Sequence, residues 1–128
     1  MSDPRTVTVG TIDAGPVTLP EPFWCCGWHP AGGYRADIAH QGQELALVVD
    51  TACHGEVRML SAALYQAPFG EHETTDVVVA VEFGEDNTES HTLNSQDLAA
   101  VADAMVAFAV GPLHELITRL QLLEGDAS

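Results

Sequence analysis

The stretch DVVVAVEF, at residues 76–83, carries the strongest strand pattern in the chain. β-Branched and aromatic residues dominate it, as is typical of strands. Upstream, EVRMLSAALYQA at residues 56–67 alternates so that Leu60 and Leu64 share one face. A short strand is expected at residues 90–93. We therefore expect an antiparallel sheet built around these segments.

Four earlier segments also have extended character. Residues 34–40 and 45–50 are predicted to be strands, and the turn-prone residues between them predict a hairpin. Residues 5–10 alternate polar and β-branched side chains, and residues 16–19 form a second short extended run. We expect this last pair to form a separate small hairpin.

The C-terminal region has the pattern of a helix. Ser95 is suited to the N-cap, and Asp97 places an acid in the first turn, where the helix dipole favours negative charge. Apolar residues then recur at steps of three and four, at Leu98, Ala102, Met105, Ala109, Leu113, Leu116, Leu120 and Leu123. Gly111 and Pro112 predict a kink or a division into two helices. Strands followed by a helix predict an α+β fold: a small antiparallel β-sheet of about four to six strands, then a C-terminal helix or kinked helix pair.

The length of 128 residues predicts a single domain. We expect an N-terminal hairpin or arm at 1–20, a Cys/His-rich loop and antiparallel sheet at 21–93, and a helical region at 95–124. The N-terminus lacks an export signal, so a cytoplasmic location is expected. Charged residues, glycine and proline interrupt the apolar residues of 98–123, and we expect no membrane span.

The chain is strongly acidic, with a formal net charge of -15. It has 19 acidic residues and no lysine, and its four basic residues are Arg5, Arg35, Arg58 and Arg119. Proteins that bind nucleic acids neutralise several phosphates with clustered Lys and Arg. Four scattered arginines cannot build such a patch, which argues against direct binding to nucleic acid.

Cysteine and histidine concentrate in EPFWCCGWHPAGGYRADIAH, at residues 21–40, and in the later pair Cys53 and His54. A zinc site can be assembled from one of two adjacent cysteines, two histidines and one member of the later pair. These candidate ligands are Cys25, His29, His40 and His54, with Cys26 and Cys53 as alternates. Such a site would hold a loop that is rich in Pro, Gly and aromatic residues, has no regular period and needs support from elsewhere.

Two other interpretations remain open for the conspicuous residues. The three cysteines are also compatible with small buried apolar groups, with Trp24 and Trp28 packed over the sheet. The helical stripe is compatible either with packing on the sheet or with an interface between copies of the chain. The interface candidates are Leu113, Leu116, Leu120 and Leu123, which follow the Gly-Pro break.

The segments EPFWCCGWH, GGYRADIAHQG and LYQAPFGE, together with the alanine-rich C-terminal helix, resemble a family of small uncharacterised actinobacterial proteins, a domain of unknown function. The family pattern of Trp-Cys, a His four residues after the Cys, and a later His matches Trp24, Cys25, His29 and His40. The resemblance favours Cys25 over Cys26 and His54 over Cys53. Members with an additional upstream cysteine have it near the position of Glu21.

No catalytic constellation or nucleotide-binding motif is evident, which favours a non-enzymatic accessory or regulatory protein that acts through protein contacts. We expect a structural zinc site and a homodimer formed through the C-terminal helix. One alternative is an acidic nucleic-acid mimic that inhibits a basic DNA-binding partner. Another is a zinc-dependent hydrolase with Glu21 or Glu44 as the base.

Overall fold

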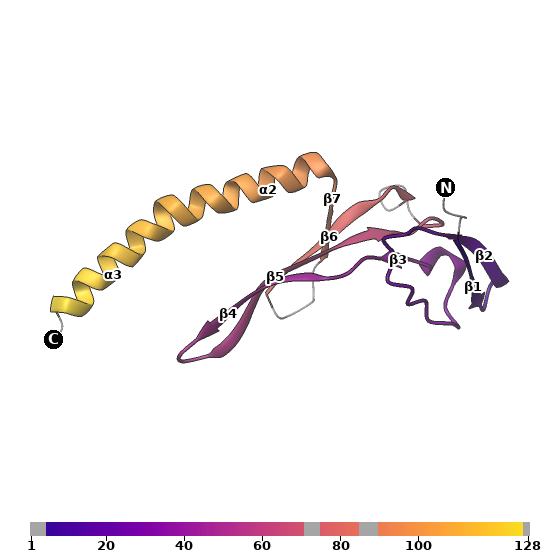
Figure 1. Ribbon diagram of the computed structural model, residues 1–128, viewed down its shortest axis with the longest axis horizontal. Helices are drawn as coiled ribbons and strands as arrows, with labels where there is room; N and C mark the ends of the chain where they lie inside the picture. The colour runs from indigo at the N-terminus through magenta and orange to yellow at the C-terminus, as the bar shows by residue number, and fades with distance from the viewer. Residues whose placement is uncertain (1–4, 71–74, 85–89, 127–128) are drawn as a thin grey trace. The chain divides into compact units, whose positions relative to one another are not determined.

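The computed structural model describes residues 5–70, 75–84 and 90–126 (Figure 1). The chain forms two compact units, Met1–Asn94 and Ser95–Ser128. The first contains two antiparallel sheets and the second a helix. The predicted α+β class is therefore confirmed.

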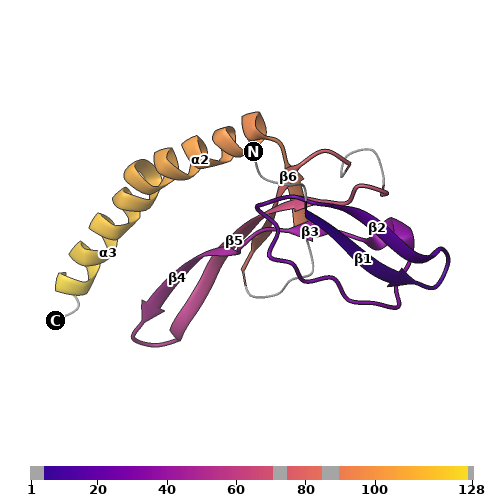
Figure 2. The ribbon, with the colours of Figure 1, turned by 45° about the vertical axis from the view of Figure 1, so that its right-hand side comes forward.

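The first two strands, β1 (Arg5–Thr11) and β2 (Gly15–Glu21), form the predicted N-terminal hairpin. Their register places alternate valine and leucine residues on one face. Val9 and Leu19 of that face are buried together with Ile38, which lies on a later loop. This small core fixes the hairpin to the chain segment that runs toward the larger sheet (Figure 2).

The larger sheet has five strands, and every pairing in it is antiparallel. They are β3 (His40–Gln41), β4 (Leu45–Thr51), β5 (Gly55–Gln66), β6 (Val78–Phe83) and β7 (Ser90–Leu93). The long strand β5 organises the sheet, because β4 pairs with its first part and β3 with its last residues, while β6 lies along its other edge. The β4–β5 hairpin thus extends away from the end of β5 that carries β3 (Figure 1).

The prediction of a strand at residues 34–40 is wrong. Arg35–Asp37 form a 3-10 turn instead, and only His40 and Gln41 pair with β5. Tertiary contacts explain the difference: the Arg35 guanidinium lies 3.8 Å from the centre of the Phe69 ring, and Ile38 is buried in the core. The predicted hairpin with residues 45–50 is wrong as well, since β4 pairs with β5.

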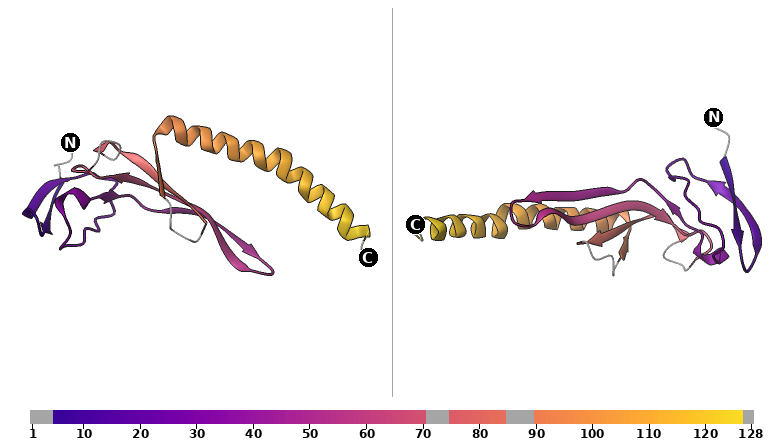
Figure 3. Two further views of the ribbon diagram at one scale, coloured as in Figure 1. Left: turned by 180° about the vertical axis from the view of Figure 1, so that it is seen from behind. Right: turned by 90° about the horizontal axis from the view of Figure 1, so that it is seen from below.

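The C-terminal unit contains one continuous helix, from Ser95 to Asp126. It comprises α2 (Ser95–Phe108), a π-helical turn (Ala109–Leu113) and α3 (His114–Asp126). Pro112 lies inside the π-helical turn. Proline has no backbone N–H to donate and its ring crowds the preceding turn, and the wider π-helical turn accommodates it without breaking the helix. The helix is therefore curved but undivided (Figure 3).

This helix is long and apolar enough to cross a membrane, judged by length and composition alone. The expectation of no membrane span rests on the Gly-Pro pair and on the charged residues Asp103, Glu115 and Arg119. The π-helical turn removes only the interruption at the Gly-Pro pair. None of the residues of the helix whose burial is described is buried.

Candidate metal centre

Four potential metal ligands converge where the N-terminal hairpin, the following loop and the larger sheet meet. Glu21 is the last residue of β2, Cys25 and His29 belong to the loop that follows, and His40 begins β3. One ligand atom from each lies within 4.8 Å of the corresponding atom in each of the others. Segments separated by up to nineteen positions in sequence thus meet at a single point.

Backbone hydrogen bonds hold the loop in this position. The Cys26 N–H donates to the Gln41 carbonyl at 2.7 Å, which ties the loop directly to β3. Gly27 has a φ of +88°, a conformation that favours glycine, and its N–H lies 3.4 Å from the Cys25 Sγ. The turn at Gly27 therefore orients the thiol toward the imidazoles and supplies it with a backbone donor.

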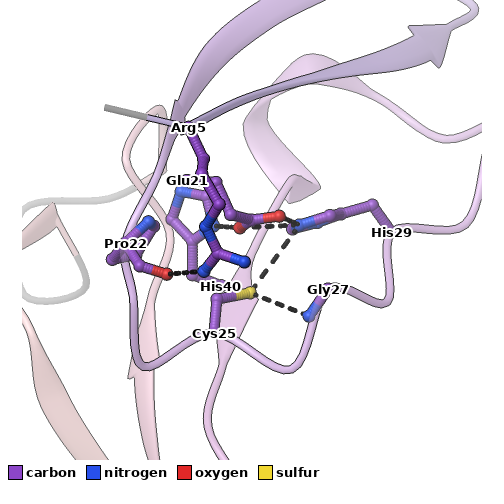
Figure 4. Close-up of polar contacts among 7 residues, drawn as sticks. All are labelled: Arg5, Glu21, Pro22, Cys25, Gly27, His29 and His40. Atoms are coloured by element: carbon purple, nitrogen blue, oxygen red, sulfur yellow. Dashed lines mark hydrogen bonds and ion pairs between the residues drawn. The ribbon is translucent and has the colours of Figure 1, made fainter. Parts of the chain in front are cut away.

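The side chains are in close polar contact (Figure 4). The Nε2 atom of His29 lies 2.9 and 3.0 Å from the two Glu21 carboxylate oxygens. The Nδ1 atom of His40 lies 2.9 Å from the Glu21 Oε1, and the Cys25 Sγ lies 3.7 Å from the His29 Nε2. The Glu21 carboxylate is therefore the centre of the cluster and lies between the His29 and His40 imidazoles.

The cluster is buried, which is unusual for such polar groups. The side chains of His29, His40 and Glu21 retain only 4%, 2% and 8% of their accessible surface. The His40 Nδ1 is close to Glu21, yet among the described residues it has no partner in hydrogen-bonding geometry. A buried nitrogen in this state costs free energy unless another species, such as a metal ion, satisfies it.

The donor set fits zinc. Thiolate, imidazole and carboxylate are all zinc ligands, with bond lengths of about 2.0–2.3 Å. Tetrahedral coordination at those lengths separates ligand atoms by roughly 3.3–3.7 Å. The 3.7 Å between sulfur and nitrogen lies at the upper end of that interval, and the shorter contacts to the carboxylate need only a small opening. Four protein ligands would complete the coordination sphere.

Burial and neighbouring groups also shift the protonation of the thiol and the carboxyl. Burial, and then the neighbouring Glu21 carboxylate, raise the pKa of the Cys25 thiol, although the backbone N–H groups of Gly27 and Gln41 oppose the shift. Burial is the largest effect on Glu21 and raises its pKa, but hydrogen bonds from Cys25 and His29 and the electrostatic influence of both histidines outweigh it. The pKa of Glu21 therefore lies below its usual range. The two shifts favour a proton on the sulfur and a negative charge on the carboxylate.

Three of the predicted ligands, Cys25, His29 and His40, are brought together by the fold. His54 and Cys53 are not: they lie in the turn between β4 and β5, at the opposite end of β5 from the residues that pair with β3. β5 has twelve residues, and a strand rises about 3.3 Å per residue, so its two ends are roughly 36 Å apart.

Glu21 takes the fourth position in the cluster. On the sequence alone, Glu21 is a candidate base of a hydrolase and marks the position near which some members of the family have an additional cysteine. The signal that could have identified it is its place at the end of a strand, four residues before Cys25 and eight before His29.

The alternative interpretation of the cysteines as buried apolar groups applies only to Cys25. Cys26 and Cys53 are exposed, as is Trp28, which retains 68% of its accessible surface. Trp24 contacts the His40 ring edge-on, with ring centres 6.2 Å apart. It therefore lies beside the cluster.

Comparison with known proteins agrees with the resemblance seen in the sequence. Residues 6–121 match the family model described as Domain of unknown function (DUF6907). The chain belongs to this family. The match includes all four members of the cluster and most of the helix. No curated protein and no solved structure matches the chain.

Proposed function

We propose that this DUF6907 protein is a non-enzymatic accessory or regulatory protein that acts through protein contacts, and that Glu21, Cys25, His29 and His40 bind a structural zinc ion. The observation that carries the proposal is the convergence of four buried ligand side chains from three chain segments. A zinc ion bound there would cross-link β2, the loop and β3. Such a cross-link supplies the support that the composition of the loop does not provide.

A structural role is favoured over hydrolysis because four protein ligands leave no open position for an activated water. The two candidate bases are also engaged. Glu21 belongs to the ligand set, and Glu44 lies on the surface with its carboxylate 2.6 Å from the Arg58 guanidinium. Neither is placed to accept a proton from a zinc-bound water.

Zinc is favoured over other metals by the mixture of ligands. A thiolate disfavours magnesium and calcium, which prefer all-oxygen sites. One sulfur, two imidazoles and one carboxylate match the borderline softness of zinc. Copper and nickel remain competitors on affinity alone, so the metal must be identified in protein purified without added metal.

Elemental analysis of the untagged protein tests this proposal. We expect about one zinc per chain in the unmodified protein and its loss in Cys25→Ser and His29→Ala. The matched controls, Cys26→Ser and His54→Ala, remove neighbouring or similar residues outside the cluster and should retain the metal. Equal loss of zinc in the two pairs of variants would refute the ligand assignment.

We further propose that the C-terminal helix forms a homodimer. Leu113, Leu116, Leu120 and Leu123 lie on the helix with exposed fractions of 39%, 57%, 57% and 63%. A helix with such a row of exposed leucines gains free energy by burying them, at about 25 cal/mol per Å² of apolar surface. A second copy presents the same row, as two-fold symmetric helix pairs require.

Insertion into a membrane is the competing explanation for these side chains, and the charges of the helix argue against it. Asp103 and Glu115 lie seven and five positions from the middle of the helix. At 1.5 Å per residue both would be within about 10 Å of the bilayer centre. Each acidic group there costs up to about 3 kcal/mol.

Sedimentation analysis without detergent tests the dimer. We expect a mass of two chains, and a mass of one chain in the double variant Leu116→Glu, Leu120→Glu. A soluble monomer for the unmodified chain, or sedimentation only with added lipid vesicles, would refute it.

A further inference from the structure

A second site lies beside the candidate metal centre, in the first unit of the chain. A cavity of about 340 Å³ opens between β1, the loop after Trp28 and the segment leading to β3. The lining includes the aromatic residues Trp28 and Tyr34 and the carboxylate-bearing Asp37. Among the four proposed zinc ligands only His29 contributes to it. The cavity is thus a distinct feature that adjoins the centre through one residue.

The walls of this cavity are fixed by the backbone. The Ile12 N–H donates to the Gly33 carbonyl and the Gly32 N–H donates to the Gly10 carbonyl, each at 2.9 Å. These bonds tie the loop to β1 on one side, and His29 ties it to the metal centre on the other. Buried Val9 and Ile38 also belong to the lining. A ligand would therefore enter a largely formed site, which lowers the entropic cost of binding.

The chemistry of the lining favours a cation with an apolar stem. Trp28 and Tyr34 keep 68% and 56% of their accessible surface, so their rings are available to a ligand. Within the described part of the chain, the side chain of Asp37 has no hydrogen bond or ion pair. Aromatic rings attract ammonium and guanidinium groups, and a carboxylate pairs with them. The volume is at the lower end of the range for ligand pockets and suits a single long side chain.

We infer that this cavity binds a lysine or arginine side chain from a basic segment of a different protein. The inference rests on the proposed action through protein contacts and names the chemistry of the partner. Charge complementarity supports it, because a chain with a net charge of -15 attracts basic segments. The aromatic pair and Asp37 would then convert general attraction into binding at one place.

A second copy of the chain is a poor source of this cation. The chain has no lysine, and three of its four arginines are engaged within the first unit. Arg5 donates to the Pro22 carbonyl at 3.2 Å, Arg35 lies against the Phe69 ring, and Arg58 pairs with Glu44. A heterologous basic protein meets the requirement without breaking any of these contacts.

The test uses the full-length, zinc-supplemented, isotopically labelled chain and a short glycine-alanine peptide with spaced lysines. Nuclear magnetic resonance shifts are recorded during titration at moderate salt. We expect shifts at residues 28–34 and at Asp37, including the indole N–H of Trp28. Trp28→Ala and Asp37→Asn should each weaken binding about fivefold. Asp50→Asn removes the same charge from an exposed position on β4 and should leave affinity unchanged.

Three results would overturn the inference. They are equal weakening by Asp37→Asn and Asp50→Asn, equal binding of a peptide with norleucine in place of lysine, and concentration-dependent shifts at the same residues without peptide. The first would show unspecific attraction, the second an apolar groove, and the third a second copy as the occupant. Zinc content is measured on each sample. A zinc-supplemented sample that contains no zinc but still binds the peptide would refute the metal centre and support the cation site.

Discussion

Removing zinc should raise the equilibrium constant for opening of the loop between Glu21 and His40, and the length of the loop sets the size of this increase. A cross-link that closes a segment of about this length contributes roughly 3 kcal/mol through chain entropy. That free energy corresponds to a factor of about 100 in the opening equilibrium. The loop also has its own backbone hydrogen bonds, such as that from Cys26 to Gln41, which persist without metal. We therefore expect opening to increase about 10- to 100-fold.

Amide hydrogen exchange measures this opening residue by residue. The reporters are the N–H groups of Cys26 and Gly32, which are bonded to carbonyls outside the loop. The control is the N–H of Gly84, bonded to the Met59 carbonyl of the larger sheet, whose exchange should change little. Chelation and the Cys25→Ser variant should accelerate the reporters alike. Unchanged reporter exchange after verified removal of zinc would refute the idea that the metal holds the loop.

Three further predictions follow from the described contacts. Gly27→Ala should weaken zinc binding by about 1–2 kcal/mol, because alanine is strained at a φ of +88°. The control Gly33→Ala should leave zinc binding unchanged, because Gly33 has open space around it and no such φ. Competition with a chelator measures both affinities, and equal effects of the two variants would contradict the role of the turn. Zinc binding should release a proton from Cys25, because burial and the adjacent carboxylate raise the pKa of the thiol. The affinity for zinc should therefore fall about tenfold for each unit by which the pH is lowered below neutrality. Calorimetry in buffers of different ionisation enthalpy detects the released proton, and its absence would argue against thiolate coordination. Ile38→Ala should lower the free energy of unfolding by about 2–5 kcal/mol, because Ile38 lies in the core with only 6% of its surface exposed. The control Ile12→Ala removes a side chain that is 64% exposed and should change the free energy of unfolding by less than about 1 kcal/mol. Denaturant titration compares the two variants, and similar losses would refute the assignment of the core.

Local patterns predicted most of the fold. The alternation at residues 56–67 and the β-branched run at residues 76–83 correspond to β5 and β6, and the N-terminal hairpin and the helix lie where expected. Residues 34–40 have a strand-like composition, but the packing of Arg35 on Phe69 determines their conformation. That contact joins residues 34 positions apart, and no local pattern reports it.

The candidate site was predictable only in part, because local spacing identifies some of its residues and the pairing of strands brings in the rest. Spacing within the loop relates Cys25 to His29. His40 completes a set of three, although it begins β3 and does not end a strand over residues 34–40 as expected. The choice of the fourth ligand depends on which strands pair. Because β3 pairs with the end of β5 instead of with β4, Glu21 at the end of β2 is near the cluster and His54 is not. Strand order, which the sequence pattern does not specify, decided this point.

X-ray absorption at the zinc edge tests the central claim most directly, because it reports the ligands around the metal in solution. We predict one sulfur at about 2.3 Å and three nitrogen or oxygen ligands at about 2.0–2.2 Å, two of them with the scattering pattern of imidazole. A spectrum without sulfur, or one with six oxygen or nitrogen ligands, would contradict it.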